Sequence, residues 1–195
     1  MIWASTKEGS ISNTRGRKIQ FGCGRNKLQG WENYDRDIDI SKPLPFPDTC
    51  ADYLFAEHVL EHLRQQDAWN FLAECYRILR GNGVIRIVVP DIVRLSKSDA
   101  THYLRKIKEL GWGDGSLKSA IRVLIFYHGH QTMWTNNLLI AVLNSIGFRA
   151  YEAQLYTSQH RSLEDIERHW MFYGSEGKKY DMAESSVIEG IKNVV

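Results

Sequence analysis

The segment KIQFGCG, residues 18–24, determines how the rest of the chain is interpreted. Its first four residues predict a short strand, and two glycines follow that strand almost at once. Because glycine has no Cβ, a turn of this kind brings backbone N–H groups close to a nucleotide-like ligand. The segment therefore predicts a strand that ends in a ligand-binding turn, and a plain strand-to-loop turn is the alternative.

The spacing of the glycines argues against a dinucleotide site. A Gly-x-Gly-x-x-Gly motif would place its third glycine at position 27, where the chain has Lys27. Only residues 25–30 separate the turn from the next strand candidate, which is too few for a crossover helix. NAD is therefore disfavoured as a ligand.

Segments further along the chain predict a strand-helix-strand unit. Apolar and alternating runs predict strands at residues 31–35, 53–56 and 84–89. From Asp67 onward, apolar residues that include Trp69 and Ala73 recur at helical spacing as far as the glycine turn at 81–83. Such a unit is typical of a parallel sheet, so the expected fold class is α/β.

The carboxyl-terminal half continues this pattern. Apolar periodicity predicts helices at residues 100–110, 117–126 and 138–146, and closing strands at residues 148–155 and 186–191. Ser162 and Asp165 have the spacing of a capping box, which predicts a short helix between the two closing strands.

Composition restricts the class of protein. A chain of 195 residues, 43% of them hydrophobic, is the size of one domain, here expected at 18–195 after a polar arm at 1–17. It has neither an apolar run long enough for a membrane helix nor a signal peptide, so we expect a cytoplasmic protein without a membrane partner. A net charge of +2 does not indicate nucleic acid, and three distant cysteines indicate a reducing compartment and no metal.

Six sequence blocks, taken in order, resemble a known family. They are QFGCG at 20–24, GWENYD at 30–35, PLPFPD at 43–48, DY at 52–53, HVLEHL at 58–63 and RGNG at 80–83. In this order they resemble class I S-adenosylmethionine-dependent methyltransferases, in particular the compact predicted methyltransferases similar to methyltransferase types 11 and 12. The resemblance implies a single-domain Rossmann-like fold of the seven-stranded type, mostly parallel, reduced near its second strand, with an antiparallel last strand.

The resemblance also implies a site for S-adenosyl-L-methionine. A carboxylate just after the second strand can accept hydrogen bonds from both ribose hydroxyls, and Asp35 has that position. The implied contacts are Gly22, Cys23 and Gly24 with the methionine part, Asp35 with the ribose, Asp39 and Ile40 with the adenine, and Glu57 and His58 with the region of the sulfonium. As alternatives, Asp39 is a solvated loop charge and Asp35 caps a turn.

Three features depart from the family pattern. The acidic residue at the head of the glycine motif is replaced by Gln20, and the third glycine by Asn26. The short connection at 25–30 leaves one face of the sheet thinly covered. We expect the arm at 1–17 or a second subunit to cover that face, which leaves a homodimer open.

Methyl transfer demands little acid or base chemistry, because the sulfonium is already activated. Candidate catalytic residues are His58, His130 with its neighbour His128, and Asp91 after the fifth family strand. The sequence FAEH at 55–58, where adenine-type amine methylases carry Asn/Asp-Pro-Pro-Tyr, argues against that acceptor class. By analogy with the compact group, the expected acceptor is a small polar molecule, for example a saccharide, bound near a lid at about 95–134.

Two rival functions remain open. The chain could be a non-catalytic module that binds S-adenosylmethionine or its product and acts through a partner protein. Alternatively, His58, Glu61 and His62 have the spacing of the inverted zinc-protease motif, which would make the chain a zinc hydrolase. That motif needs one helix through His58 and His62, whereas a strand is expected to end near Ala56.

Overall fold

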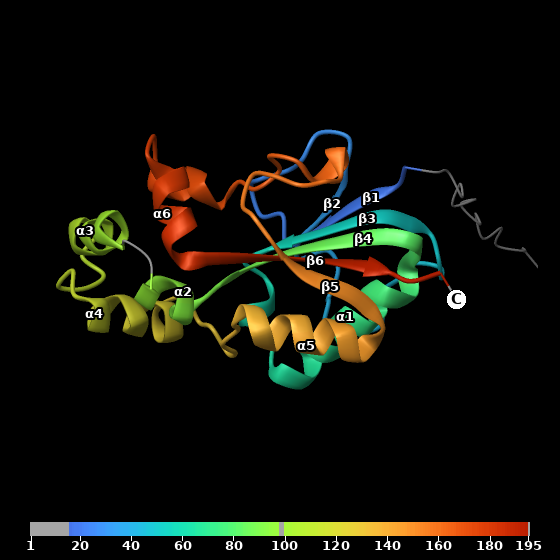
Figure 1. Cartoon of the computed structure of the whole chain (residues 1–195), viewed down its shortest axis with the longest axis horizontal. Helices are drawn as coiled ribbons and strands as arrows, with labels where there is room; N and C mark the ends of the chain where they lie inside the picture. Colours follow the sequence, from blue (N-terminus) through green and yellow to red (C-terminus); the bar gives the residue numbers. More distant parts are fainter. Residues whose placement is uncertain (1–15, 98–99, 195) are drawn as a thin grey trace, which may run out of the picture.

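The computed structural model describes residues 16–97 and 100–194, which form a six-stranded sheet with helices around it (Figure 1). The strands are β1 Lys18–Phe21, β2 Glu32–Tyr34, β3 Ala51–Glu57, β4 Leu79–Pro90, β5 Phe148–Ala153 and β6 Ser185–Lys192. They lie in the order β2-β1-β3-β4-β6-β5, and β6 runs antiparallel to both strands that flank it, β4 and β5. The predicted α/β fold, mostly parallel with an antiparallel last strand and reduced near the second strand, is confirmed.

The chain is reduced on both sides of β2: the connection at 25–30 before it contains no helix, as predicted, and a second reduction lies between β2 and β3. Residues 35–50 are all described and contain no helix or strand, because three prolines hold 43–47 as an extended loop. Arg77, near the end of the helix that follows β3, fastens this loop by donating hydrogen bonds to the carbonyl oxygens of Leu44 at 3.0 Å and Phe46 at 2.8 Å. The loop therefore takes the place of a further edge strand.

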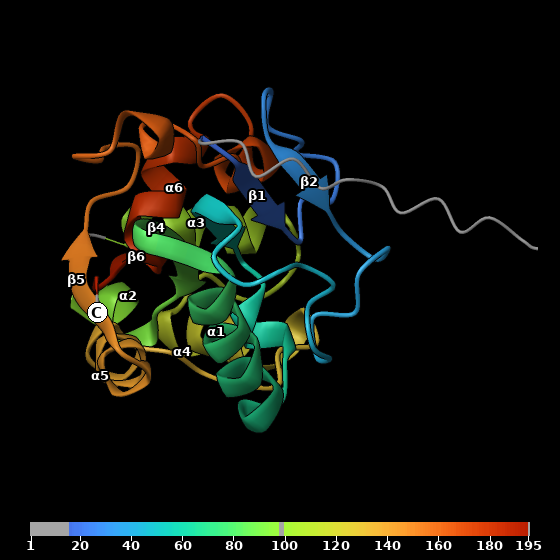
Figure 2. The same cartoon turned by 90° about the vertical axis from the view of Figure 1, so that its right-hand side faces the viewer.

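Two helices cover one face of the sheet. They are α1 Gln65–Ile78 and α5 Asn136–Ile146, which lie on the same side in Figures 1 and 2. Their apolar side chains join those of the strands in the largest core cluster, which includes Phe71, Leu72, Leu139 and Leu143. The predicted apolar face of α1 is wrong at Trp69 and Ala73, which are exposed. The buried side chains of this helix are Ala68, Phe71, Leu72, Cys75 and Ile78.

The segment between β5 and the carboxyl-terminal helix covers the opposite face. Leu155, Leu163 and Ile166 of this segment pack with Leu28 of the short connection against Phe55, Val84 and Val88 of the sheet. The 3₁₀ turn η3, Arg161–Leu163, lies in this segment. A segment of the chain itself therefore packs on this face. The expectation that the arm covers it falls on residues 1–15, which lie outside the described residues, and cover by a second subunit stays a prediction.

A buried ion cluster attaches that segment to the sheet. Arg86 of β4 is fully buried and donates hydrogen bonds to Glu167 Oε1 at 2.6 Å, Glu189 Oε1 at 2.5 Å and the carbonyl oxygen of Gln154 at 2.7 Å. Since a buried guanidinium without partners would be very costly, these contacts determine where the segment lies.

The remaining helices gather beyond the carboxyl ends of the parallel strands (Figure 1). They are α2 Ile92–Lys97, α3 Thr101–Glu109, α4 Leu117–Arg122, the π-helical turn η2 Val123–Tyr127, the 3₁₀ turn η4 His169–Tyr173 and α6 Gly177–Glu184. Tyr103, Ile107 and Leu124 form a separate core cluster with Tyr173 and Tyr180. The region predicted as a lid thus packs on η4 and α6.

The differences from the predicted elements have local causes. Residues 81–83 continue β4 instead of forming a separate turn. The short helix predicted between the two closing strands is the 3₁₀ turn η3, which begins at Arg161 and has no side-chain cap, so Ser162 lies inside it and the capping-box prediction is wrong. The helix α6 was missed because it begins with glycine and buries Asp181 and Glu184, so it lacks an apolar stripe. Among the described residues, no helix is both long and apolar enough to cross a membrane.

Candidate functional site

The glycine turn follows β1 directly, as predicted. Gly22 and Gly24 have φ angles of 65° and 48°, in the left-handed region that favours glycine. The N–H of Cys23 donates to the carbonyl oxygen of Tyr34 at 3.1 Å, so the turn is attached to β2. A Cβ at position 22 would lie 2.3 Å from Val59 Cγ2, whereas one at position 24 would meet nothing within 4 Å. The backbone at Gly24 is therefore open to a ligand.

Two side-chain amides hold the short connection after the turn. Gln20, which is 2% exposed, donates to the carbonyl oxygen of Asn26 at 3.2 Å and accepts from the N–H of Leu28 at 3.3 Å. Asn33 accepts from the same N–H at 2.8 Å and donates to the carbonyl oxygen of Leu28 at 3.0 Å. Gln20 thus supports the loop where the family has an acidic residue.

The predicted ribose and adenine residues lie on the loop after β2. Asp35 follows β2 immediately and is exposed, at the same edge of the sheet as the glycine turn. Asp39 is exposed too, and its Oδ1 accepts from the hydroxyl of Ser41 at 2.6 Å and its N–H at 3.0 Å. These hydrogen bonds lower the pKa of Asp39. Ile40 packs against the main core.

The residues predicted to lie near the sulfonium, Glu57 and His58, are more buried than the exposed acids after β2. Glu57 ends β3 and is buried, and its carboxylate accepts the backbone N–H groups of Arg168 at 2.9 Å and His169 at 3.0 Å. Burial raises the pKa of Glu57 to about 7, against the effect of these hydrogen bonds. Glu57 therefore holds the segment before η4 in place.

His58 redirects the chain after β3. Its φ of 53° is unusual for a residue with a Cβ and costs roughly 1–2 kcal/mol. Its N–H donates to the carbonyl oxygen of Val88 at 2.9 Å, and the chain continues into the 3₁₀ turn η1, Leu60–His62. His58 and His62 therefore do not share a helix, and the geometry required for the zinc-protease motif is not formed.

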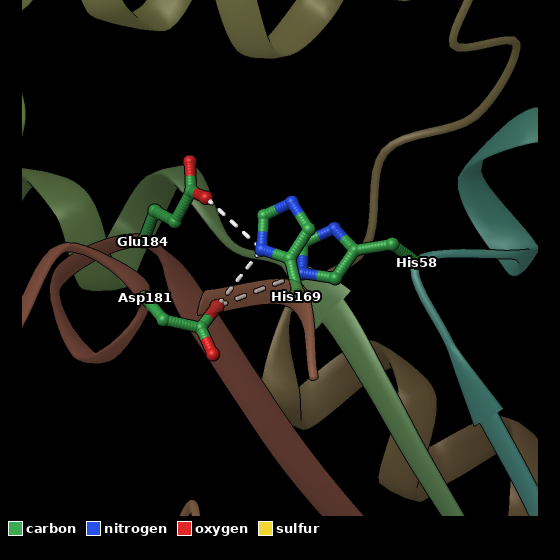
Figure 3. Close-up of side chains that lie close together, drawn as sticks. All are labelled: His58, His169, Asp181 and Glu184. Carbon is green, nitrogen blue, oxygen red and sulfur yellow. Dashed lines mark hydrogen bonds and ion pairs between the residues drawn. The ribbon is translucent and has the colours of Figure 1, made fainter. Parts of the chain in front are cut away.

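Three sequence segments bring a polar cluster together around His58 (Figure 3). The rings of His58 and His169 stack with centroids 3.6 Å apart. His169 Nδ1 lies 3.0 Å from Asp181 Oδ1 and 3.7 Å from Glu184 Oε1, and His58 Nε2 lies 3.9 Å from Asp181 Oδ1. The sequence analysis missed His169, Asp181 and Glu184, because no local motif links them to His58.

Burial and charge shift the ionisation of these groups. Burial and the neighbouring His169 lower the pKa of His58, which favours the neutral imidazole. Burial lowers the pKa of His169 as well, but the hydrogen bond and charge of Asp181 outweigh it and raise the value to about 9. Burial raises the pKa of Glu184 to about 7 and also raises that of Glu61.

A cavity of about 320 Å³ opens beside this cluster. Its polar lining consists mainly of histidines and carboxylates: His58, Glu61, His62, His130, His169 and Glu184. The structure thus brings together two predicted catalytic residues, His58 and His130. His130 Nδ1 makes a short contact with the carbonyl oxygen of Leu124.

The third predicted catalytic residue lies elsewhere. Asp91 is 3% exposed, and its Oδ1 accepts the N–H groups of Val93 and Arg94 at the start of α2. Its Oδ2 accepts from Ser186 and from the N–H of Asn136 at the start of α5. Both oxygens of this carboxylate therefore hold helix ends together, and a catalytic role for Asp91 stays a prediction.

Comparison with known proteins agrees with this architecture. Residues 20–87 match the family model described as a methyltransferase domain. An Archaeoglobus fulgidus methyltransferase dependent on S-adenosylmethionine superposes with a TM-score of 0.51 at 16% identity, covering 90% of this chain and 86% of its own. The chain has the fold of an S-adenosylmethionine-dependent methyltransferase. The resemblance inferred from the six sequence blocks is thereby confirmed.

Two further structures share this methyltransferase fold. A chain of the Haloferax volcanii complex that contains the Trm112 methyltransferase activator has a TM-score of 0.53 at 11% identity, covering 91% of this chain and 83% of its own. Haemonchus contortus phosphoethanolamine N-methyltransferase 2, in complex with S-adenosyl-L-methionine, has a TM-score of 0.52 at 11% identity. The match covers 91% of this chain and 49% of the Haemonchus protein. No curated protein matches the sequence.

Proposed function

We propose that this chain transfers a methyl group from S-adenosylmethionine to an oxygen or nitrogen atom of a small polar acceptor. The observation that carries the proposal is the contact of Val59 with Gly22. Val59 follows His58 directly, so the glycine turn and the histidine-lined cavity are neighbours at the carboxyl edge of the sheet. Open sheets of this type bind their ligands at that edge.

The residues present fit the cofactor. The backbone at Gly24 is open, and Asp35 presents an exposed carboxylate where a ribose would need an acceptor. When bound, S-adenosylmethionine supplies an activated methyl group on its sulfonium. The protein then has to bind the acceptor, exclude water and, for a hydroxyl acceptor, remove a proton.

The cavity lining indicates the class of acceptor. Histidines and carboxylates are joined by aromatic side chains, among them Tyr103 and Phe172, and among the described residues no lysine or arginine belongs to the lining. The pKa of His169 is raised, but this imidazole is already paired with Asp181 and Glu184, so a hydroxylated or amine-bearing acceptor, for example a saccharide, fits better than a phosphate-bearing one. The neutral imidazole of His58 is the favoured proton acceptor, with His130 as the alternative.

Calorimetric titration with S-adenosylmethionine and S-adenosylhomocysteine tests the cofactor assignment. We expect Asp35→Ala to weaken binding at least tenfold, about 1.4 kcal/mol, because the ribose loses its acceptor. Asp114→Ala removes an exposed carboxylate from a distant loop and should leave the affinity unchanged. A folded protein that binds neither compound would refute the proposal.

Turnover separates the proposal from a non-catalytic binding module. A methyltransferase forms S-adenosylhomocysteine when a suitable hydroxylated or amine acceptor is present. Saturable cofactor binding without turnover across a panel of such acceptors would favour the binding module instead.

A further inference from the structure

The four side chains of Figure 3 are arranged as a set of metal ligands. His58, His169, Asp181 and Glu184 each offer one ligand atom, and these atoms all lie within 4.8 Å of one another. In a tetrahedral zinc site, metal–ligand bonds of about 2.0–2.2 Å separate neighbouring ligand atoms by roughly 3.3 Å. The separations of 3.0, 3.7 and 3.9 Å bracket that value, and the remaining ones are at most 4.8 Å, so an ion would draw the more distant ligands together and turn the stacked imidazole rings toward it.

The buried acidic side chains around this site outnumber the cationic groups that face them. Asp181, Glu184 and Glu61 are buried within it, and Glu57 lies directly beneath His169. Among residues 16–97 and 100–194, no salt bridge joins a lysine or arginine to any of these four carboxylates. His169 faces Asp181 and Glu184, and its raised pKa favours the protonated imidazole. A divalent ion would displace this proton and bring a further positive charge to the buried carboxylates, whose excess negative charge is costly.

Glu61 provides an independent indication. It is 1% exposed, and neither of its carboxylate oxygens has a hydrogen-bond partner within the described part of the chain. Its Oε1 lies 3.3 Å from His58 Nδ1, on the side of the ring facing away from Asp181. A buried carboxylate without a donor adds to the negative potential around His58, which an ion bound on the other side of the ring would offset.

Hydrogen bonds from further residues orient the acidic ligands. Tyr156 donates to Asp181 Oδ2 at 2.5 Å, Ser185 donates to Asp181 Oδ1 at 2.8 Å, and Tyr173 donates to Glu184 Oε1 at 2.5 Å. Support of this kind is typical of metal sites, where outer hydrogen bonds hold the ligands in position. A purely structural cluster would not need both carboxylates to face the same imidazole nitrogen.

We propose that His58, His169, Asp181 and Glu184 bind a divalent transition-metal ion, with Zn²⁺ favoured by the two nitrogen and two oxygen ligands. The site lies in the wall of the cavity to which the acceptor was assigned, since three of its four ligands line that cavity. An ion there can bind an acceptor oxygen, and His130 rather than the metal-bound His58 would then accept the proton of the acceptor; only this last step rests on the proposed function.

Metal binding by the purified full chain tests the site without any methyl acceptor. After dialysis against a chelator, the protein is titrated with Zn²⁺ in competition with a chromogenic chelator, and bound metal is measured by mass spectrometry. We expect one ion per chain and a higher melting temperature with Zn²⁺ than without, because the ion binds only the folded state. His169→Gln and Glu184→Gln should each weaken binding at least tenfold.

His128→Gln is the matched control, because His128 lines the same cavity but is not one of the four ligands. It should keep the affinity of the unaltered protein, and circular dichroism should show every variant folded. The proposal is overturned if the folded protein binds no Zn²⁺, or if His169→Gln and Glu184→Gln bind it normally. It is also overturned if His130→Gln alone abolishes binding, which would place the ion on the neighbouring group Glu61, His62 and His130. None of these outcomes depends on whether the chain binds S-adenosylmethionine.

Discussion

The carboxyl edge of the sheet has two halves of different construction. The glycine half, residues 18–35, is one continuous stretch in which backbone groups and the amides of Gln20 and Asn33 determine the shape. The histidine half combines residues 57–62, 168–169 and 181–185, and its carboxylates, Glu57, Glu61, Asp181 and Glu184, are buried. A ligand can be recognised by local backbone in the first half, whereas the second half depends on the whole fold.

The largest expected effect concerns the ion cluster that places the segment carrying His169. Replacing Arg86 with alanine leaves Glu167 and Glu189 buried without their cation. We expect the free energy of unfolding to fall by about 3–5 kcal/mol in urea titrations. The matched change at Arg105, whose side chain is 54% exposed, should cost at most about 1 kcal/mol. If both changes lowered the free energy of unfolding equally, the buried Arg86 cluster would contribute no more to stability than an exposed ion pair.

The next effect tests the contact between the two halves. Gly22→Ala forces an alanine into φ 65° and drives its Cβ against Val59, so the loss of unfolding free energy should reach about 2–4 kcal/mol. Gly24→Ala has the φ penalty alone and should cost only about 1–2 kcal/mol. Adding Val59→Ala to Gly22→Ala should relieve the overpacking, and no recovery in thermal denaturation would mean that the halves do not meet there.

The smallest effect lies inside the glycine half. Gln20→Met removes a buried donor from the carbonyl oxygen of Asn26, while the N–H of Leu28 keeps its bond to Asn33. We expect a loss of about 1 kcal/mol, with faster hydrogen exchange confined to residues 25–30. Faster exchange in α6 as well would show that the two halves are more tightly coupled than their contacts indicate.

The glycine half could be predicted because its signals are local. The positive φ angles of Gly22 and Gly24, the strand before them and Asp35 after β2 all follow from residue types at short spacing. Predictions were least successful where tertiary contacts decide which side chains of a helix are buried. Trp69 and Ala73 fit a helical period but face solvent, and α6 buries two carboxylates that made it unrecognisable as a helix.

The sequence by itself determined the α/β order, the glycine turn and the family resemblance, because periodicity, glycine and proline act over a few residues. Only the tertiary structure decided which segment covers the second face of the sheet and which acids meet His58. These pairings join residues more than a hundred positions apart, such as Glu57 with His169 and His58 with Asp181. They form because buried charges need partners wherever the chain can supply them.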